Sequence, residues 1–259
     1  MTNFEFLKQY EQLQYTIMFD SLVDLGFAVV SYCRGDKAAF WNHALTDQTL
    51  TEGQLTVIEE NLGEQGRRPA IYFENADRLK TLALFLESHG YKRDFRDSWM
   101  WHSGTDLDLS KSENVHKVEN EQELQTFLTV FNACYQKDDP QNVYGELGDY
   151  LSVAEAVWHK HHKIDRLEYF VVYKDALPVA VSTLTSFRNI GYISNVGSLQ
   201  EVRGQGFGKL ATLYCVEQSK RRGNTTHCLA TEEGTYANKF YSHIGFVTKF
   251  TAVCYKKNE

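Results

Sequence analysis

The sequence has few cysteines and no long apolar run. Its five cysteines are scattered, odd in number and never arranged as C-x-x-C, which argues against a disulfide framework and against a structural zinc site. No apolar stretch approaches the roughly 18 residues that a membrane span needs, and the N-terminus lacks the basic start and apolar middle of a signal peptide. We therefore expect a cytoplasmic protein in a reducing compartment, without a membrane partner.

An excess of positive charge is also missing. The formal net charge is -7 and no stripe of basic and aromatic residues is present, so nucleic-acid binding is disfavoured. The charge is uneven, however: residues 203–259 hold nine Lys or Arg against four Asp or Glu, a balance of +5. Residues 1–202 then carry -12, because the two parts sum to -7. A basic C-terminal part suits an anionic ligand, although solvated lysines on a helix surface would give the same count.

The length of the chain leaves its domain organisation open. A chain of 259 residues fits one large domain or two small ones, and a hydrophobic content of 42% is enough for a substantial core. The segment 103–114 is polar, charged and without apolar periodicity, which makes it the best linker candidate. We therefore predict a first domain at 1–106 and a second domain at 113–259.

Hydrophobic patterning predicts strands and helices in both parts, and hence an α/β fold. In the first part the expected strands are 26–32, 37–45, 68–75 and 97–101, and the expected helices are 54–62 and 76–88. In the second part the expected strands are 115–118, 167–173, 177–187, 191–199 and 226–233, and the clearest helix is 121–134. Both parts thus mix helices with strands.

A glycine-rich turn follows the strand at 191–199 and runs directly into a helical pattern. Glycines stand at every second position, Gly204, Gly206 and Gly208. A Walker A loop is excluded because no Ser or Thr follows the lysine, and a dinucleotide fingerprint is excluded because its third glycine would fall on Lys209. What is left is a turn whose backbone N–H groups meet the positive end of a helix dipole. The turn is predicted to seat a pyrophosphate, the alternative being a turn that serves packing only.

Two motifs carry a resemblance to a known family. The stretch VGSLQEVRGQGFGKLA resembles the acetyl-coenzyme A binding motif of the GNAT superfamily of N-acetyltransferases, V-x-T-x-P-x-x-R-G-x-G-x-G. Val196, Arg203 and the three glycines match this motif, whereas Ser198 stands for its Thr and Gln200 for its Pro. A second stretch, ANKFYSHIGF, is similar to the superfamily's A-x-x-[LF]-Y-x-x-x-G-F. The resemblance covers residues 115–259 and implies a GNAT fold, a mixed central sheet flanked by helices.

One sequence element of the second part recurs in similar form in the first part; we call this recurrence the echo. The stretch ADRLKTLALFLESHGYKRDF resembles TYANKFYSHIGFVTKF, since both combine a helix, Ser-His, a glycine, an aromatic residue and a strand. The first part has no counterpart of R-x-x-G-x-G. The resemblance therefore implies a tandem form with a smaller, degenerate GNAT-like N-terminal domain. The alternative is that Ser-His-Gly is a common way to end a helix.

The resemblance also implies roles for individual residues. Backbone N–H groups near Val196–Ser198 would bind the thioester carbonyl as it becomes an oxyanion, and the amides of the glycine turn would hold the pyrophosphate. Arg203 and Lys209 would add charge there, or would be solvated. The implied coenzyme-binding residues are Val196, Gly197, Ser198, Arg203, Gly204, Gln205, Gly206, Phe207, Gly208, Lys209 and Asn238. The acceptor pocket is expected from residues 134–165 and the first part.

Direct attack of an amine on a thioester needs an acid and a base rather than a nucleophilic cysteine or serine. Tyr241 occupies the position that donates a proton to the leaving thiolate in the superfamily, with packing as its alternative role. Glu232 is the base that we predict, and Glu168 and Glu233 stay open as alternatives. The three histidines of WHKHHK would suggest a metal, but neighbours at i and i+2 on a helix face apart, so we expect no metal.

The function implied is an N-acetyltransferase with acetyl-CoA as cosubstrate. The acceptor would be a primary amine of a small molecule or a peptide. A non-catalytic acyl-CoA-binding regulatory module is the alternative, because it would need the same turn but no base. The sequence names neither the acceptor nor the oligomeric state, and a homodimer stays open.

Overall fold

The computed structural model describes residues 1–104, 107–142, 144–164 and 166–258. Among the helices within these residues, none is both long enough and apolar enough to cross a membrane.

The chain divides into two compact units. Unit 1 consists of Met1–Trp99 and Lys249–Glu259, and unit 2 consists of Met100–Thr248. Two strands, β5 (Tyr91–His102) and β11 (Phe246–Lys257), therefore contribute residues to both units. Compact units need not be domains that fold independently, so the domain limits given above stay a prediction.

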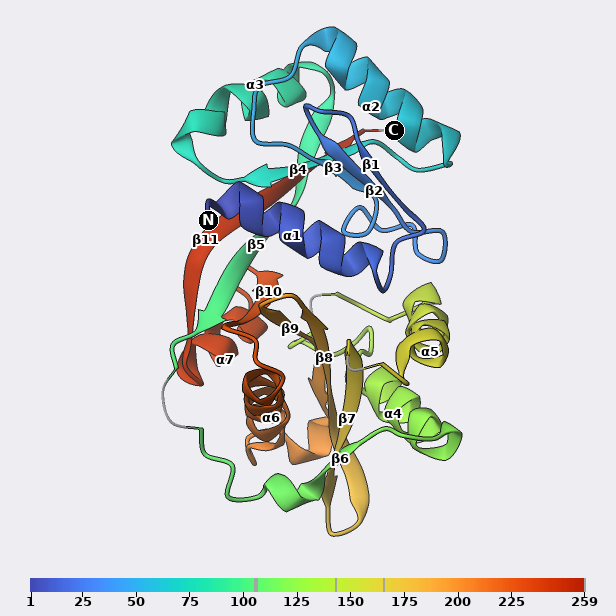
Figure 1. Cartoon of the computed structure of the whole chain (residues 1–259), viewed down its shortest axis with the longest axis vertical. Helices are drawn as coiled ribbons and strands as arrows, with labels where there is room; N and C mark the ends of the chain where they lie inside the picture. Colours follow the sequence, from blue (N-terminus) through green and yellow to red (C-terminus); the bar gives the residue numbers. More distant parts are fainter. Residues whose placement is uncertain (105–106, 143, 165, 259) are drawn as a thin grey trace. The chain divides into compact units, whose positions relative to one another are not determined.

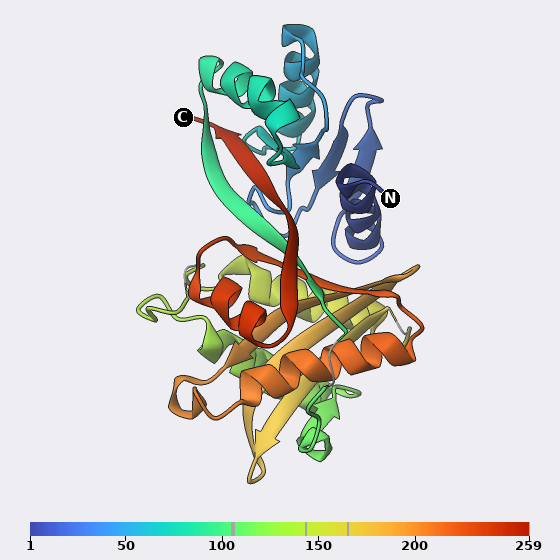
Figure 2. The same ribbon diagram turned by 90° about the vertical axis from the view of Figure 1, so that its left-hand side faces the viewer.

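Unit 1 is a mixed sheet covered by helices (Figures 1 and 2). Its strands lie in the order β1-β2-β3-β4-β11-β5, with β3 and β4 parallel and β4 and β11 antiparallel. Besides the parts of β5 and β11, its elements are α1 (Asn3–Tyr15), β1 (Ser21–Asp24), β2 (Val29–Tyr32), β3 (His43–Leu45), α2 (Glu52–Glu64), β4 (Ala70–Glu74), the 3-10 helix η1 (Asp77–Leu79) and α3 (Lys80–Ser88).

Helix α1 is a part of unit 1 that the sequence patterns did not predict. It begins with a capping box, in which the Thr2 hydroxyl accepts from the Glu5 N–H and the Glu5 carboxylate accepts from the Thr2 N–H. Its apolar side packs edge-on against Trp99 through Phe6 and Tyr10, with ring centroids 5.4 and 4.7 Å apart. Aromatic burial rather than a clean helical period thus holds this helix on the sheet.

The strand expected at 37–45 is shorter in the structure, where β3 covers only His43–Leu45. The buried side chain of Asn42 explains this difference. Its amide donates to the carbonyls of Asp36 and Ala38, and its oxygen accepts from the Cys33 N–H. An Asn that bonds nearby backbone groups favours a turn over a strand, because those groups are then lost to the ladder.

The strands of unit 2 also form a mixed arrangement, with helices on both faces. Its strands lie in the order β10-β9-β8-β7-β6, and α6 lies on the opposite face from α4 and α5 (Figure 1). Besides the ends of β5 and β11, its elements are the 3-10 helix η2 (Ser112–Asn114), β6 (Val115–Lys117), α4 (Glu121–Cys134), α5 (Asp149–His161), β7 (Leu167–Lys174), β8 (Leu177–Phe187), β9 (Ile190–Ser198), η3 (Gln200–Val202), α6 (Phe207–Arg221), β10 (Thr226–Glu232) and α7 (Tyr236–His243). The predicted fold class, a mixed sheet flanked by helices, is confirmed.

The segment expected to be a linker, 103–114, includes residues 105 and 106, which lie outside the described residues. Farther along it, Leu107 and Leu109 pack against the apolar core of unit 2. The described part of this segment therefore belongs to the body of unit 2.

Strands β9 and β10 separate part of the way along their length. They run parallel and pair from Ile190–Thr226 to Tyr192–Cys228, where the described pairing ends. On its other side β9 stays paired with β8, with an irregular register around Asn195, whose φ is 52°. The backbone of β9 after Tyr192 therefore has one edge that no described residue of β10 covers, and this opening leads to the glycine turn.

Candidate active site

The glycine turn gives α6 an uncapped beginning. Gly204 and Gly206 both have positive φ, 76° and 90°, a conformation that side chains disfavour. Gly206 is the N-cap of α6, and within the described parts of the chain this helix start has no side-chain cap hydrogen bond. A Cβ atom added at Gly204 or Gly206 would meet nothing within 4 Å. The turn thus leaves both hydrogen-bond donors and space for an anion.

A cavity of about 330 Å³ lies beside this turn. It is bounded by the free edge of β9, the glycine turn, α7 and the segment that follows α4. Among the predicted site residues, those that line it are Val196, Gly197, Ser198, Arg203, Gly204, Gly206, Phe207, Gly208, Lys209 and Tyr241. The structure therefore brings the two sequence motifs, which are far apart in the chain, to one cavity.

Gln205 and Asn238, two of the predicted coenzyme-binding residues, are not part of the cavity wall. The side chain of Gln205 is turned to Lys174, whose Nζ donates to its Oε1 over 2.9 Å. The backbone N–H of Asn238 donates to the Thr235 hydroxyl that caps α7, and its amide nitrogen lies 3.5 Å from the sulfur of Met100. Both side chains are thus occupied by contacts away from the turn.

The predicted base, Glu232, also lies outside the cavity wall. It ends β10, and its backbone N–H donates to the hydroxyl of Tyr144 over 3.2 Å. Of the alternatives, Glu168 is 3% exposed and pairs with Arg222 and Lys117 over 2.7 and 3.1 Å, which is a structural network. Glu233 is exposed. The role of Glu232 as base stays a prediction.

The two cations of the turn have different surroundings. Arg203 donates two hydrogen bonds to Asp139, Nη1 to Oδ1 over 2.8 Å and Nη2 to Oδ2. This pairing holds the pKa of the Asp139 carboxyl below its ordinary value, although burial opposes the shift. Lys209 lies 3.8 Å from Asp108, and both side chains are exposed. Only Arg203 is thus held in place by its partner.

Sequence reasoning missed the aromatic residues of the cavity wall. Tyr135 donates its hydroxyl proton to the Val196 carbonyl over 3.2 Å, and Tyr144 reaches the end of β10, where its hydroxyl lies 3.4 Å from that of Thr231. Tyr236 also lines the cavity. These residues belong to no motif, and the only signal for the first two was that an acceptor pocket was expected somewhere in 134–165.

Tyr241 is suited to donating a hydrogen bond. It projects from α7 and its ring lies 5.1 Å from that of Phe240 and 5.8 Å from that of Phe246, centroid to centroid. Burial raises the pKa of its hydroxyl, so the group stays protonated at neutral pH. Burial also raises the pKa of the cavity thiol Cys134 to about 12, which leaves it without thiolate character. The described wall therefore offers a hydrogen-bond donor in Tyr241 and no thiolate nucleophile in Cys134.

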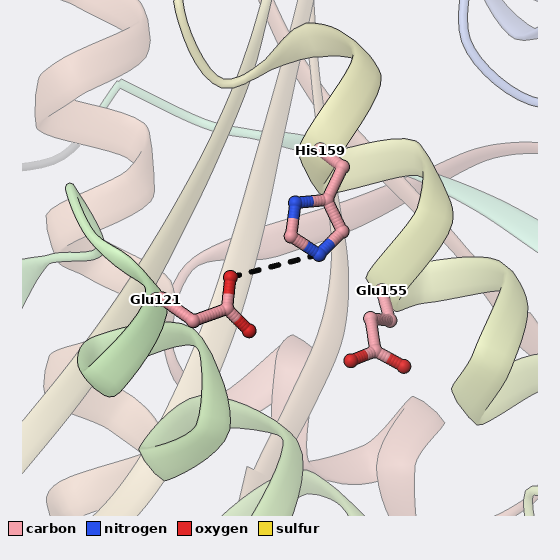
Figure 3. Close-up of side chains that lie close together, drawn as sticks. All are labelled: Glu121, Glu155 and His159. Atoms are coloured by element: carbon pink, nitrogen blue, oxygen red, sulfur yellow. Dashed lines mark ion pairs between the residues drawn. The ribbon is translucent and has the colours of Figure 1, made fainter.

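One group of side chains approaches the composition of a metal site. Glu121 of α4 and Glu155 and His159 of α5 point toward one another, with one ligand atom of each within 4.8 Å of the others (Figure 3). His159 and Glu121 are 47% and 59% exposed and form an ion pair at 3.6 Å. Exposed acidic groups are common without an ion, and the cluster is not part of the cavity wall.

A family model described as "Acetyltransferase (GNAT) family" matches residues 124–246. No curated protein matches the chain.

Solved structures match over nearly the whole chain. A GCN5-related N-acetyltransferase from Kribbella flavida is 19% identical with a TM-score of 0.71, covering 99% of this chain and 95% of its own. A conserved protein of unknown function from Staphylococcus epidermidis is 15% identical with a TM-score of 0.68, covering 93% and 94%. A tandem GNAT protein from the clavulanic acid biosynthesis pathway is 13% identical with a TM-score of 0.56, covering 88% and 77%. At these identities the likeness concerns the fold alone.

Proposed function

We propose that this chain, whose residues 124–246 match the acetyltransferase (GNAT) family, transfers an acetyl group from acetyl-CoA to a primary amine. The amine attacks the thioester directly. The acceptor is a small molecule or a peptide with a free amine.

A single observation carries this proposal: the uncapped N-terminus of α6 and the free edge of β9 open onto the same cavity. The first provides N–H groups at the positive end of a helix, which suit a pyrophosphate. The second provides extended backbone in which N–H groups from Val196 to Ser198 can hold a thioester carbonyl. The residues present therefore fit acetyl-CoA at both of its polar groups.

The chain's own groups would act at three points of the reaction. Acetyl-CoA supplies the activated acyl group. N–H groups of β9 stabilise the negative charge that develops on the carbonyl oxygen, and a fixed donor of this kind contributes more than water does because it needs no reorientation. The hydroxyl of Tyr241 donates to the departing sulfur. Glu232 stays our prediction for the group that removes the amine proton, directly or through water.

The charges of the cavity wall bear on the acceptor and on catalysis. Among the described residues of the wall, Asp139 is the one carboxylate, and Arg203 neutralises it. The wall therefore offers an approaching amine no free anionic side chain. This observation favours an amine that binds through aromatic and hydroxyl contacts, and it is also what a non-catalytic acyl-CoA-binding module would show.

The test is calorimetric titration with acetyl-CoA, followed in the same preparation by an assay of free-thiol release with a panel of primary amines. We expect binding at one site and thiol release with one class of amine. Binding without release from any amine would replace the acetyltransferase with the binding module. Absence of binding would overturn both. A homodimer stays a separate prediction, to be checked by the mass of the protein in solution.

A further inference from the structure

The segment between α4 and α5 is fastened to the coenzyme side of the cavity. We call residues 135–142 and 144–148 the α4–α5 loop. At its beginning, Tyr135 donates to the Val196 carbonyl of β9. Toward its end, Tyr144 accepts from the backbone N–H of Glu232 in β10. The loop therefore spans the opening between the two strands at which the acyl group is proposed to lie.

Between these tyrosines, Asp139 ties the loop to the glycine turn. Its side chain is only 1% exposed, and it accepts both terminal nitrogens of Arg203. It also accepts from the Gln141 N–H over 3.0 Å. A buried carboxylate with three donors fixes its surroundings strongly, because leaving any of them unpaired is costly.

The guanidinium of Arg203 has N–H groups that Asp139 does not use. A guanidinium carries five N–H groups, of which Asp139 takes two, and no described residue bonds the other three. The side chain is 22% exposed and lines the cavity next to Gly204. Such a planar fork can hold a carboxylate along one edge and a phosphate oxygen along another.

We propose that Arg203 links the coenzyme phosphate to Asp139, so that binding of the coenzyme tightens the α4–α5 loop and completes the acceptor side of the cavity. This inference rests on the proposed function, since it needs a coenzyme on the glycine turn. Asp139 is in this sense a positioning residue, acting through Arg203 rather than on the substrates. The link couples two sites, so the coenzyme raises the affinity for the amine and the amine raises that for the coenzyme.

Hydrogen exchange with coenzyme A as the probe tests the link without any knowledge of the acceptor. In the wild type, coenzyme A should slow exchange in peptides covering residues 135–142 by roughly fivefold or more. Asp139→Asn keeps the shape of the side chain but removes its charge. We expect this variant to bind coenzyme A within about threefold of the wild type, while the slowing in the loop disappears.

Three further variants separate positioning from mere structure. Asp138→Asn removes the neighbouring, exposed carboxylate and should behave as the wild type. Asp139→Glu restores the charge and should restore part of the coenzyme-dependent slowing, which a purely structural loss would not allow. If Asp139→Asn fails to fold, Arg203→Lys takes its place: it keeps the cation but not the fork, and the slowing should again be lost.

The outcomes are distinct for the two proposals. Loss of the slowing in Asp139→Asn with coenzyme binding retained supports the link. Slowing that persists in that variant, or that is missing in the wild type although coenzyme A binds, overturns the link and leaves the proposed function standing. A wild type that does not bind coenzyme A at all overturns the proposed function, and the link with it.

Discussion

Helices α2 and α6 occupy comparable places in their units, since each follows a strand and packs on a sheet, but they begin in opposite ways. At the start of α2 a capping box takes up the N–H of Gln54, which donates to Thr51, and the N–H of Thr51, which donates to the Gln54 side chain. Helix α6 follows Gly206 and has no side-chain cap. A capped helix start has fewer donors left for a ligand. The comparison thus separates a helix that only builds the fold from one that can also bind.

Elsewhere the two units are alike. Both α3 and α7 end in Ser-His, pass through a glycine with positive φ and continue into a strand of 12 residues. The glycines are Gly90 and Gly245, with φ values of 82° and 100°. The echo found in the sequence is therefore repeated in backbone conformation. Together with the capped start of α2, it agrees with a tandem form whose first half is degenerate.

The largest effect is expected when the uncapped end of α6 is given a negative charge. Gly208 has ordinary φ, and a Cβ there would make normal contacts at 3.7 Å, so Gly208→Asp should fold and even favour the helix start. Beside a pyrophosphate the carboxylate should weaken acetyl-CoA binding by roughly 100-fold or more, measured by calorimetry.

The matched control is Gly208→Asn, which has the same shape without the charge and should cost less than about tenfold. Equal affinities of the two variants for acetyl-CoA would contradict a pyrophosphate at this end of α6. The proposed difference between α6, which binds a ligand, and α2, which does not, would then be lost.

The second effect concerns Tyr241, which directly precedes Ser-His in α7, whereas Glu87 directly precedes Ser-His in the first unit. Tyr241→Phe removes the proton donor but keeps the ring. Turnover should fall by about 100-fold or more with little change in the affinity for acetyl-CoA. An unchanged rate in the thiol-release assay would return Tyr241 to a packing role.

The third predicted effect is a pH dependence of stability that arises in unit 1, where the buried pair Glu11 and His43 shares a proton. Nδ1 of His43 lies 3.0 Å from the Ala39 carbonyl, which can only accept, so Nδ1 is protonated. Nε2 lies 3.1 Å from a Glu11 oxygen, and this contact needs a second proton on one of the two residues. Burial lowers the pKa of His43. The Glu11 carboxylate and the hydrogen bond to it together raise this pKa by more than burial lowers it, so the net shift is upward.

The sign of this shift fixes the pH dependence. Stability from His43 is fully present below its ordinary pKa of 6.5 and is lost as pH rises through the raised pKa of the folded state. The free energy of unfolding of the wild type should therefore fall above pH 6.5, by at most about 1.4 kcal/mol per pH unit. Denaturant titrations from pH 6 to 9 measure it.

Glu11→Gln is the informative variant, because its amide can donate to a neutral imidazole without an extra proton. We expect the fall with pH to disappear in this variant and to persist in the exposed control His116→Gln. A fall of the same size in Glu11→Gln would show that the pair is not its source.

The smallest effect comes from opening the capped helix. Thr51→Ala frees the N–H group that Thr51 closes at the start of α2 and should cost about 1 kcal/mol of stability, against a few tenths for the exposed Thr56→Ala within the helix. Calorimetry with acetyl-CoA should still show one site. Binding of a second acetyl-CoA molecule to Thr51→Ala would mean that a helix start without a side-chain cap is enough for binding. The glycine turn would then add nothing to the affinity.

The sequence predicted what is local and missed what is assembled from distant segments. The glycine turn and helix 121–134 could be predicted because their signals lie in consecutive residues. Helix α1 escaped because polar Glu11 and Gln14 lie on its buried face and weaken the apolar pattern. The pair of Asp139 and Arg203 spans 64 positions in the chain, so neither residue has a signal that points to the other. The same holds for Tyr144, whose hydroxyl meets β10 only in the folded chain.

The pairing of β11 with β4 determines when the sheet of unit 1 is completed during synthesis. Residues Ala252–Lys256 of β11 pair with β4, and Val253 and Tyr255 are part of the apolar core of unit 1. A ribosome delivers β4 long before β11, so β4 lacks this partner until the residues of unit 2 have been made. The sheet of unit 1 is therefore completed only after unit 2 has been synthesised, although most residues of unit 1 come first.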